Sequence, residues 1–244
     1  MTLQWTAFGV TAFFALLRVP GVIRGENRGI FAALVLMALA VALGIPFFYL
    51  SLDALLGGVN ITNLVIRYSL FAIFLILGLK LAAAFNSPRA RWLIGGPVGL
   101  SVLAAAVAAA AVLFVISDLP ESSTALEAYR GQNTVLAYSD VGRVYTAYVA
   151  ACLAPALSAY AADSRRRWDI RLSAGLISLG MAAVVIHSLL SVALWGLERG
   201  AWDFLLNYGA VIVVALGLTI MWNSRRVAKK NPELGSLATV LGSR

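Results

Sequence analysis

Residues 92–116 read WLIGGPVGLSVLAAAVAAAAVLFVI and contain no charged side chain. An α-helix rises about 1.5 Å per residue, so a run of this length can cross the hydrocarbon core of a bilayer, which is about 30 Å thick. The run therefore predicts a membrane-spanning helix. Its alanine-rich part, 104–111, predicts close packing against other helices, because small side chains let helix backbones approach each other in lipid.

Six further apolar runs accompany it in the chain. Of the 244 residues, 61% are hydrophobic and 12% are charged, whereas soluble domains are about half apolar and a quarter charged. We expect an all-α, polytopic transmembrane bundle of about seven helices, with residues 1–222 as the transmembrane domain and 223–244 as a short basic cytoplasmic tail. The other predicted spans are 3–17 (continuing to 23), 29–52, 61–85, 139–163, 172–197 and 204–222.

The positive charges lie mostly on one side of the predicted membrane. Fifteen of the 19 Lys and Arg residues fall in alternate loops and in the C-terminal tail. Cytoplasmic loops of membrane proteins carry such an excess, so we predict a multi-pass protein of the cytoplasmic membrane, with the N-terminus outside and the C-terminus in the cytoplasm. This pattern indicates contact with membrane lipids, a membrane-protein partner or a second copy of the chain, and not nucleic acid.

Polar side chains gather at the predicted outer ends of the spans. A charged side chain inside the bilayer costs a few kcal/mol, so each such residue needs a partner or access to water. They predict an outward-facing polar vestibule that binds a ligand; the alternative is that they cap helices and form structural ion pairs. The candidate residues are Tyr49, Asp53, Asn60, Asn63, Arg67, Asp140, Arg143, His187, Ser191, Glu198 and Asn207.

Arg67 is the most costly of these residues, because it lies about two turns inside its span. Asn60 and Asn63 precede it at a spacing that places all three on one helix face. We predict that Arg67 points into the bundle and pairs with a carboxylate, with Asp140 as the first candidate and Asp53 as the second.

No pattern in the chain indicates a catalytic site, a metal site or a cofactor. His187 is the single histidine and Cys152 the single cysteine, whereas zinc normally takes three or four His, Cys or carboxylate ligands. His187 has two interpretations: a neutral imidazole bonded to a neighbouring helix, or a proton relay or metal or haem ligand. No Gly-rich phosphate loop is present. We therefore do not expect an enzyme.

Three groups of residues carry a family resemblance. They are 52–57 (LDALLG) with Asn60 and Asn63, then Tyr138 with Val144, Tyr145 and Tyr148, and finally Arg171 and Leu172 with 175–177 (GLI) and Gly180. With them, the chain resembles a family of actinobacterial seven-helix membrane proteins that are generally described as transporters. The resemblance covers most of residues 18–197. It implies the seven-helix topology, and it supplies no catalytic residue.

Two functions remain open from the sequence. The first is a non-catalytic sensor or accessory subunit that binds a ligand or membrane partner through the vestibule. The second is a small-solute transporter, a class that usually shows internal repeats and helices broken near the membrane midplane. The sequence shows no convincing repeat, which favours the first function. A scaffold within a larger complex would also account for the short loops.

Overall fold

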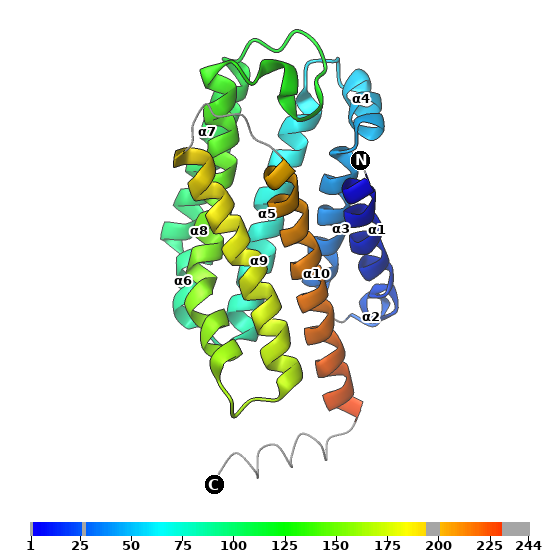
Figure 1. Ribbon diagram of the computed structural model, residues 1–244, viewed down its shortest axis with the longest axis vertical. Coiled ribbons are helices and arrows are strands. Elements are labelled where there is room, and N and C mark those ends of the chain that lie inside the picture. The colour runs from blue at the N-terminus through cyan, green and yellow to red at the C-terminus, as the bar shows by residue number, and fades with distance from the viewer. Residues whose placement is uncertain (1, 26–27, 194–200, 231–244) are drawn as a thin grey trace.

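The structure of the protein is a computed structural model, and it describes residues 2–25, 28–193 and 201–230. Every regular element in these ranges is a helix, so the predicted all-α class is confirmed (Figure 1). The elements are α1 (Thr2–Leu16), α2 (Val19–Ile23), α3 (Arg28–Leu43), α4 (Pro46–Leu55), α5 (Ile61–Ala84), α6 (Pro88–Gly95), α7 (Pro97–Val115), the 3₁₀ helix η1 (Thr124–Tyr129), α8 (Asn133–Ala162), α9 (Trp168–Ala193) and α10 (Ala201–Lys230).

Five stretches of helix are long and apolar enough to cross a membrane. They are Gln4–Ile23, Ile61–Ala84, Pro88–Val115, Asn133–Ala162 and Trp168–Ala193. The bent pair α3 and α4 makes a sixth if it counts as one span. The apolar part of α10, Tyr208–Ser224, is shorter than these spans. The described residues therefore contain five or six candidate spans, where the sequence predicted about seven.

The predicted second span, 29–52, is not one straight helix. α3 ends at Leu43, α4 begins at Pro46, and their axes differ by 91°. Proline lacks a backbone N–H and disfavours a helical conformation in the residue before it, and Ile45 is accordingly extended (φ −84°, ψ 127°). The bend directs α4 toward α5 and η1, which it contacts at the end of the bundle that carries residues 117–132. We call this the loop end.

The surface of the bundle is apolar. Phe47 and Val115 are 70% and 79% exposed, and Phe13 and Leu189 are each more than half exposed. A helix bundle in water places charged side chains at such positions, whereas lipid accepts apolar ones. The fold is therefore that of a multi-pass helical membrane protein.

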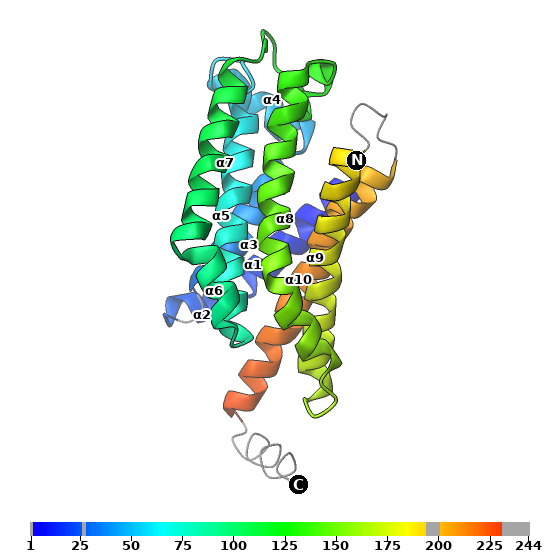
Figure 2. The ribbon, with the colours of Figure 1, turned by 90° about the vertical axis from the view of Figure 1, so that its left-hand side faces the viewer.

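The centre of the bundle is formed by α5 and α8. The rings of Phe71 and Tyr145 pack edge to face, with their centroids 4.9 Å apart. One to two turns further along, Gly78 allows Val149 to approach closely, since a Cβ on Gly78 would lie 2.8 Å from a Val149 methyl carbon. Figure 2 shows α5, α7 and α8 as one group, and Figure 1 shows α9 between α8 and α10.

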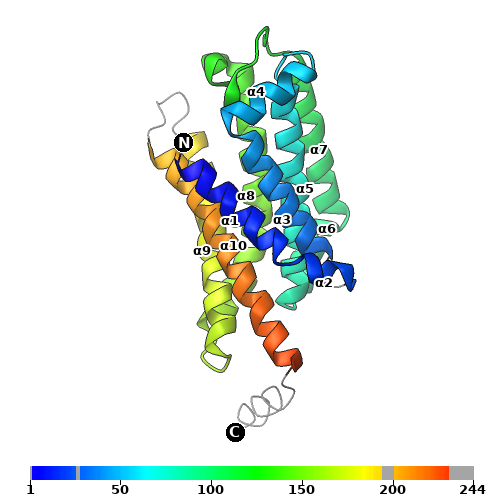
Figure 3. The same ribbon diagram turned by 90° about the vertical axis from the view of Figure 1, so that its right-hand side faces the viewer.

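α10 joins the bundle through close contacts with α9. A Cβ on Gly180 of α9 would lie 2.5 Å from a Val214 methyl carbon, and one on Gly217 of α10 would lie 2.7 Å from the side chain of Ile177. The small residues therefore set the distance between these two helices. α1 crosses both α3 and α10 on the other side (Figure 3).

The alanine-rich part of α7 packs against the bundle along one face. Ala106 and Ala110 are buried, and α7 contacts α8. Ala104, Ala105 and Ala108 are exposed. Close packing of this stretch is thus confirmed for one face, and the opposite face is open to lipid.

We predict that Ala110→Leu destabilises the protein and that Ala108→Leu does not. Ala110 has no exposed surface, so a larger side chain overpacks the contact of α7 with α8, at a cost of about 1–3 kcal/mol. Ala108 is exposed on the same helix and is the matched control. Thermal unfolding in detergent measures both variants, and equal melting temperatures would contradict the predicted packing.

Candidate functional site

A buried polar cluster, which we call the polar knot, lies at the loop end. It consists of Tyr49, Asp53, Asn60 and Ser122, with backbone atoms of residues 60, 62, 121 and 123. One carboxylate oxygen of Asp53 accepts hydrogen bonds from the backbone N–H of Asn60 (2.8 Å) and from the Ser122 hydroxyl (2.5 Å). The other accepts from the backbone N–H of Thr62 at 2.9 Å. Asp53 therefore caps the start of α5, where backbone N–H groups have no helical partner.

Asn60 connects α4 and α5 to the loop. Its side-chain oxygen accepts hydrogen bonds from the Tyr49 hydroxyl (3.0 Å) and the backbone N–H of Ser123 (2.7 Å). Its amide nitrogen donates to the backbone carbonyl of Glu121 at 2.6 Å. The backbone of Asn60 is left-handed (φ 64°), a conformation that asparagine tolerates better than most residues. The polar knot thus fixes the position of residues 121–123 above α5.

The predicted pairing of Arg67 with Asp53 is wrong. Asp53, Asn60 and Tyr49 have no exposed surface, and both carboxylate oxygens of Asp53 already accept hydrogen bonds within the polar knot. These three candidate residues therefore belong to a structural cluster and do not line an open vestibule.

Arg67 points from α5 toward α8, as predicted. The central carbon of its guanidinium group lies 4.7 Å from the ring centroid of Tyr138, within the range of a cation–π interaction. Space for the guanidinium comes from Gly142, where a methyl group would overlap it. The Nε atom of Arg67 and the hydroxyl of Tyr138 are both buried and lack a hydrogen-bond partner.

The predicted ion pair between Arg67 and Asp140 is also wrong. Asp140 accepts a charge-assisted hydrogen bond at 2.5 Å from Arg143, three residues further along α8. This neighbour is held on the same helix face by the helix itself, so it competes better than a residue on another helix. Among the described residues, no carboxylate lies within ion-pair distance of Arg67.

Arg67 faces a cavity of about 210 Å³ between α5, η1 and α8. We call this the arginine pocket, since Arg67, Arg130 and Arg143 all line it, together with the polar side chains of Asn63 and Ser139. No carboxylate side chain is among the described residues that line it. Two of the three arginines have carboxylate partners just outside the lining, Arg143 with Asp140 and Arg130 with Glu127, which leaves the charge of Arg67 without one among the described residues.

Apolar side chains form the rest of the wall. Ile66 and Leu70 come from α5, Val135 and Leu136 from α8, and Leu126 from η1. The lining is therefore mixed, with about as many polar as apolar side chains.

The turn of η1 that covers the pocket is strained. Ala125 (φ 57°, ψ 20°) and Leu126 (φ 55°, ψ 33°) both have left-handed backbone conformations, which cost residues with a Cβ about 1–2 kcal/mol each. Leu126 is almost fully buried, so packing holds it in this conformation. Strained backbone of this kind is found preferentially at ligand clamps and switch regions.

The remaining candidate residues lie elsewhere. His187 and Ser191 are buried on α9, which packs against α8, and neither lines the pocket. Glu198 and the side chain of Asn207 lie outside the described residues. In the described part of the chain, no group of three His, Cys, Asp or Glu side chains is placed to hold a metal ion.

Sequence reasoning missed several residues of the site. The candidate residues predicted from the sequence do not include Ser122, Arg130, Tyr138 or Ser139. Arg130 stands in the longest polar connection, which was a usable signal. Gly142 gave no signal, because its importance comes from a side chain on another helix.

We predict that Asp53→Ala strongly destabilises the protein. The change leaves two buried backbone N–H donors and the half-buried Ser122 hydroxyl without an acceptor, and a cost of about 2–4 kcal/mol is expected. Asp118→Ala, which removes an exposed carboxylate near the same loop, is the control. Thermal unfolding in detergent measures both, and an Asp53→Ala protein that melts with the wild type would show that the polar knot is not needed for stability.

Comparison of the chain with known protein families, with curated proteins and with solved structures finds no match. The resemblance to actinobacterial seven-helix proteins therefore stays a prediction. What the chain does must be argued from the arginine pocket and the helices that carry it.

Proposed function

We propose that this chain is a seven-span, non-catalytic protein of a bacterial cytoplasmic membrane that binds a small ligand in the arginine pocket. In this proposal the loop end faces outward, and the protein acts as a sensor or accessory subunit that works with a membrane-protein partner or a second copy. The observation that carries the proposal is the cavity itself, which is lined by three arginine side chains, those of Arg67, Arg130 and Arg143. Convergent charged groups around a concave site are typical of ligand-binding pockets.

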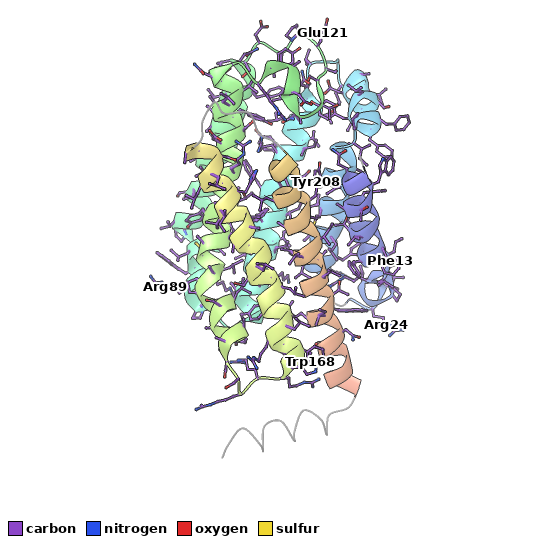
Figure 4. The ribbon with its side chains drawn as sticks, viewed as in Figure 1. Phe13, Arg24, Arg89, Glu121, Trp168 and Tyr208 are labelled. Carbon is purple, nitrogen blue, oxygen red and sulfur yellow. The ribbon has the colours of Figure 1, made fainter. Side chains whose placement is uncertain are left out.

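The distribution of charge supports the outward orientation. Arg24, Arg89 and Trp168 lie toward the end opposite Glu121 (Figure 4). Exposed basic residues at that end also include Arg91, Arg165 and Arg166. Because cytoplasmic loops carry the excess of positive charge, this end fits the cytoplasmic side, and the pocket then opens toward the outside.

Packing beneath the pocket favours a binding protein over a transporter. Phe71 lies one turn below Arg67 on α5, and its ring packs edge to face against Tyr145 of α8. Both rings are nearly fully buried, and Leu77 and Val149 continue the apolar core below them. A solute that entered the pocket would meet this layer. The small-solute transporter remains the second candidate, and it requires this layer to open.

A direct contact links the pocket to the other half of the bundle. Arg143 lines the pocket, and its backbone carbonyl lies 3.1 Å from the Ser188 hydroxyl of α9, which it shares as a donor with the carbonyl of Val184 at 2.8 Å. α9 in turn packs closely against α10, whose far end extends toward the opposite side of the protein (Figure 1). A shift of α8 at Arg143 would therefore be passed to α9 and α10, as a sensor requires.

We predict the topology with single cysteines in a Cys152→Ala background. Ala128→Cys, in η1, should react with a membrane-impermeant thiol reagent in intact cells, whereas Ser164→Cys, in the turn between α8 and α9, should react only after lysis. Both positions are exposed. The reverse pattern would overturn the proposed orientation.

We predict that a cysteine in the pocket can be reached from one side only. Ser139→Cys, in the same background, should react with the impermeant reagent in right-side-out vesicles and not in inside-out vesicles. A transporter exposes its site to both sides in turn, so it would be labelled in both preparations. Reaction from both sides would assign the transporter. No reaction even in detergent would show that the cavity is closed to ligands, and the proposed function would fail.

A further inference from the structure

We propose that the ligand of the arginine pocket is a small oxyanion, such as a carboxylate, phosphate or sulfate group, held by Arg67, Arg130 and Arg143. This inference rests on the proposed function, because it names the chemical class that the proposed site would take. Its first support is the charge of the lining, which has three guanidinium groups and, among the described residues, no carboxylate.

The three arginines differ in how well their charge is neutralised. Arg143 is paired with Asp140 at 2.5 Å, and both side chains are mostly buried. Arg130 lies 3.8 Å from Glu127, and both of these side chains are largely exposed, so water and salt screen the pair. Arg67 has no carboxylate partner in the described part of the chain. The pocket therefore carries a positive charge that an anion would neutralise.

The geometry of Arg67 fits an oxyanion better than a spherical anion. The Tyr138 ring, whose centroid is 4.7 Å from the guanidinium carbon, and the close approach to Gly142 confine the guanidinium group of Arg67. A guanidinium group offers parallel N–H donors, which match the paired oxygens of a carboxylate, phosphate or sulfate.

The volume of the pocket limits the size of the ligand. The cavity of about 210 Å³ is smaller than the roughly 300–1,000 Å³ of pockets that take drug-sized ligands. That space holds an oxyanion with a short organic part and excludes a lipid chain. The apolar wall of Ile66, Leu70 and Leu136 would contact the organic part. The same oxyanion chemistry is present in a lipid phosphate that reaches in from the membrane surface, so the test must separate the two sources.

The test uses the purified protein in phosphatidylcholine nanodiscs. It asks whether inorganic phosphate, sulfate or succinate protects the protein against thermal unfolding and against labelling by a thiol reagent. Chloride at matched ionic strength controls for screening. At least one oxyanion should raise the melting temperature and slow the labelling of Ser139→Cys. Arg67→Lys should weaken its apparent affinity by about tenfold or more, the equivalent of one lost charge-assisted hydrogen bond. Arg89→Gln, which removes an exposed arginine at the opposite end, should leave the affinity unchanged.

Two further variants keep the test decisive if Arg67→Lys does not fold. Arg130→Gln changes a largely exposed side chain and should also weaken binding, and Ser139→Trp fills the pocket and should abolish it. Val144→Trp, at an exposed position on α8, is the control for the added bulk. Oxyanion affinities that are unchanged in Arg130→Gln and Ser139→Trp would overturn the inference.

The remaining outcomes show whether the oxyanion proposal fails alone or together with the proposed function. Protection by phosphatidylglycerol nanodiscs without added anion would assign the oxyanion to a lipid headgroup. Equal protection by chloride, or protection of Ser139→Cys only by a neutral compound, would overturn the oxyanion while the proposed outward pocket stands. A Ser139→Cys side chain that no reagent reaches would remove both proposals.

Discussion

The first turn of α5 begins with backbone N–H groups that have no helical partner, and the carboxylate of Asp53 supplies two of them with an acceptor. In a membrane protein this need is acute, because lipid offers no water to replace the missing acceptor. The same carboxylate accepts the hydroxyl of Ser122, and so the cap of α5 also holds the loop. Since the loop continues into η1 and Arg130, the position of the arginine pocket depends on a carboxylate that does not line it.

A second constraint on the structure is the free-energy cost of placing the Arg67 cation inside the bundle. The chain meets this cost in three ways: the ring of Tyr138 faces the guanidinium, Gly142 leaves room for it, and the pocket beside it admits water or a ligand. Arg67 thereby differs from four other described arginines, which each pair with a carboxylate two or three residues away along the chain.

Much of the fold could be predicted from apolar runs and charges, since lipid imposes length and composition on every span. The bend at Pro46 was not predicted, although Pro46 itself was visible in the run 29–52. In the site, the free-energy cost of exposing a charge to lipid correctly predicted that Arg67 points into the bundle. Both carboxylates predicted to pair with it were wrong. Asp53 was already used by backbone donors, and Asp140 by Arg143 on its own helix. Sequence shows which groups need partners, whereas the competition between possible partners is decided only in three dimensions.

The polar residues of the loop end thus divide into two groups with opposite properties. Those of the polar knot have their hydrogen bonds satisfied by each other and exclude water, so they have nothing left to offer a ligand. Those of the arginine pocket bring three guanidinium groups to an open volume, and Arg67 among them has no carboxylate partner in the described part of the chain. Between the two lies the strained turn at Ala125 and Leu126, which is fixed at one side by the knot and carries Arg130 at the other. An anion that drew Arg130 inward would therefore act on this turn first, because the knot holds the residues before it.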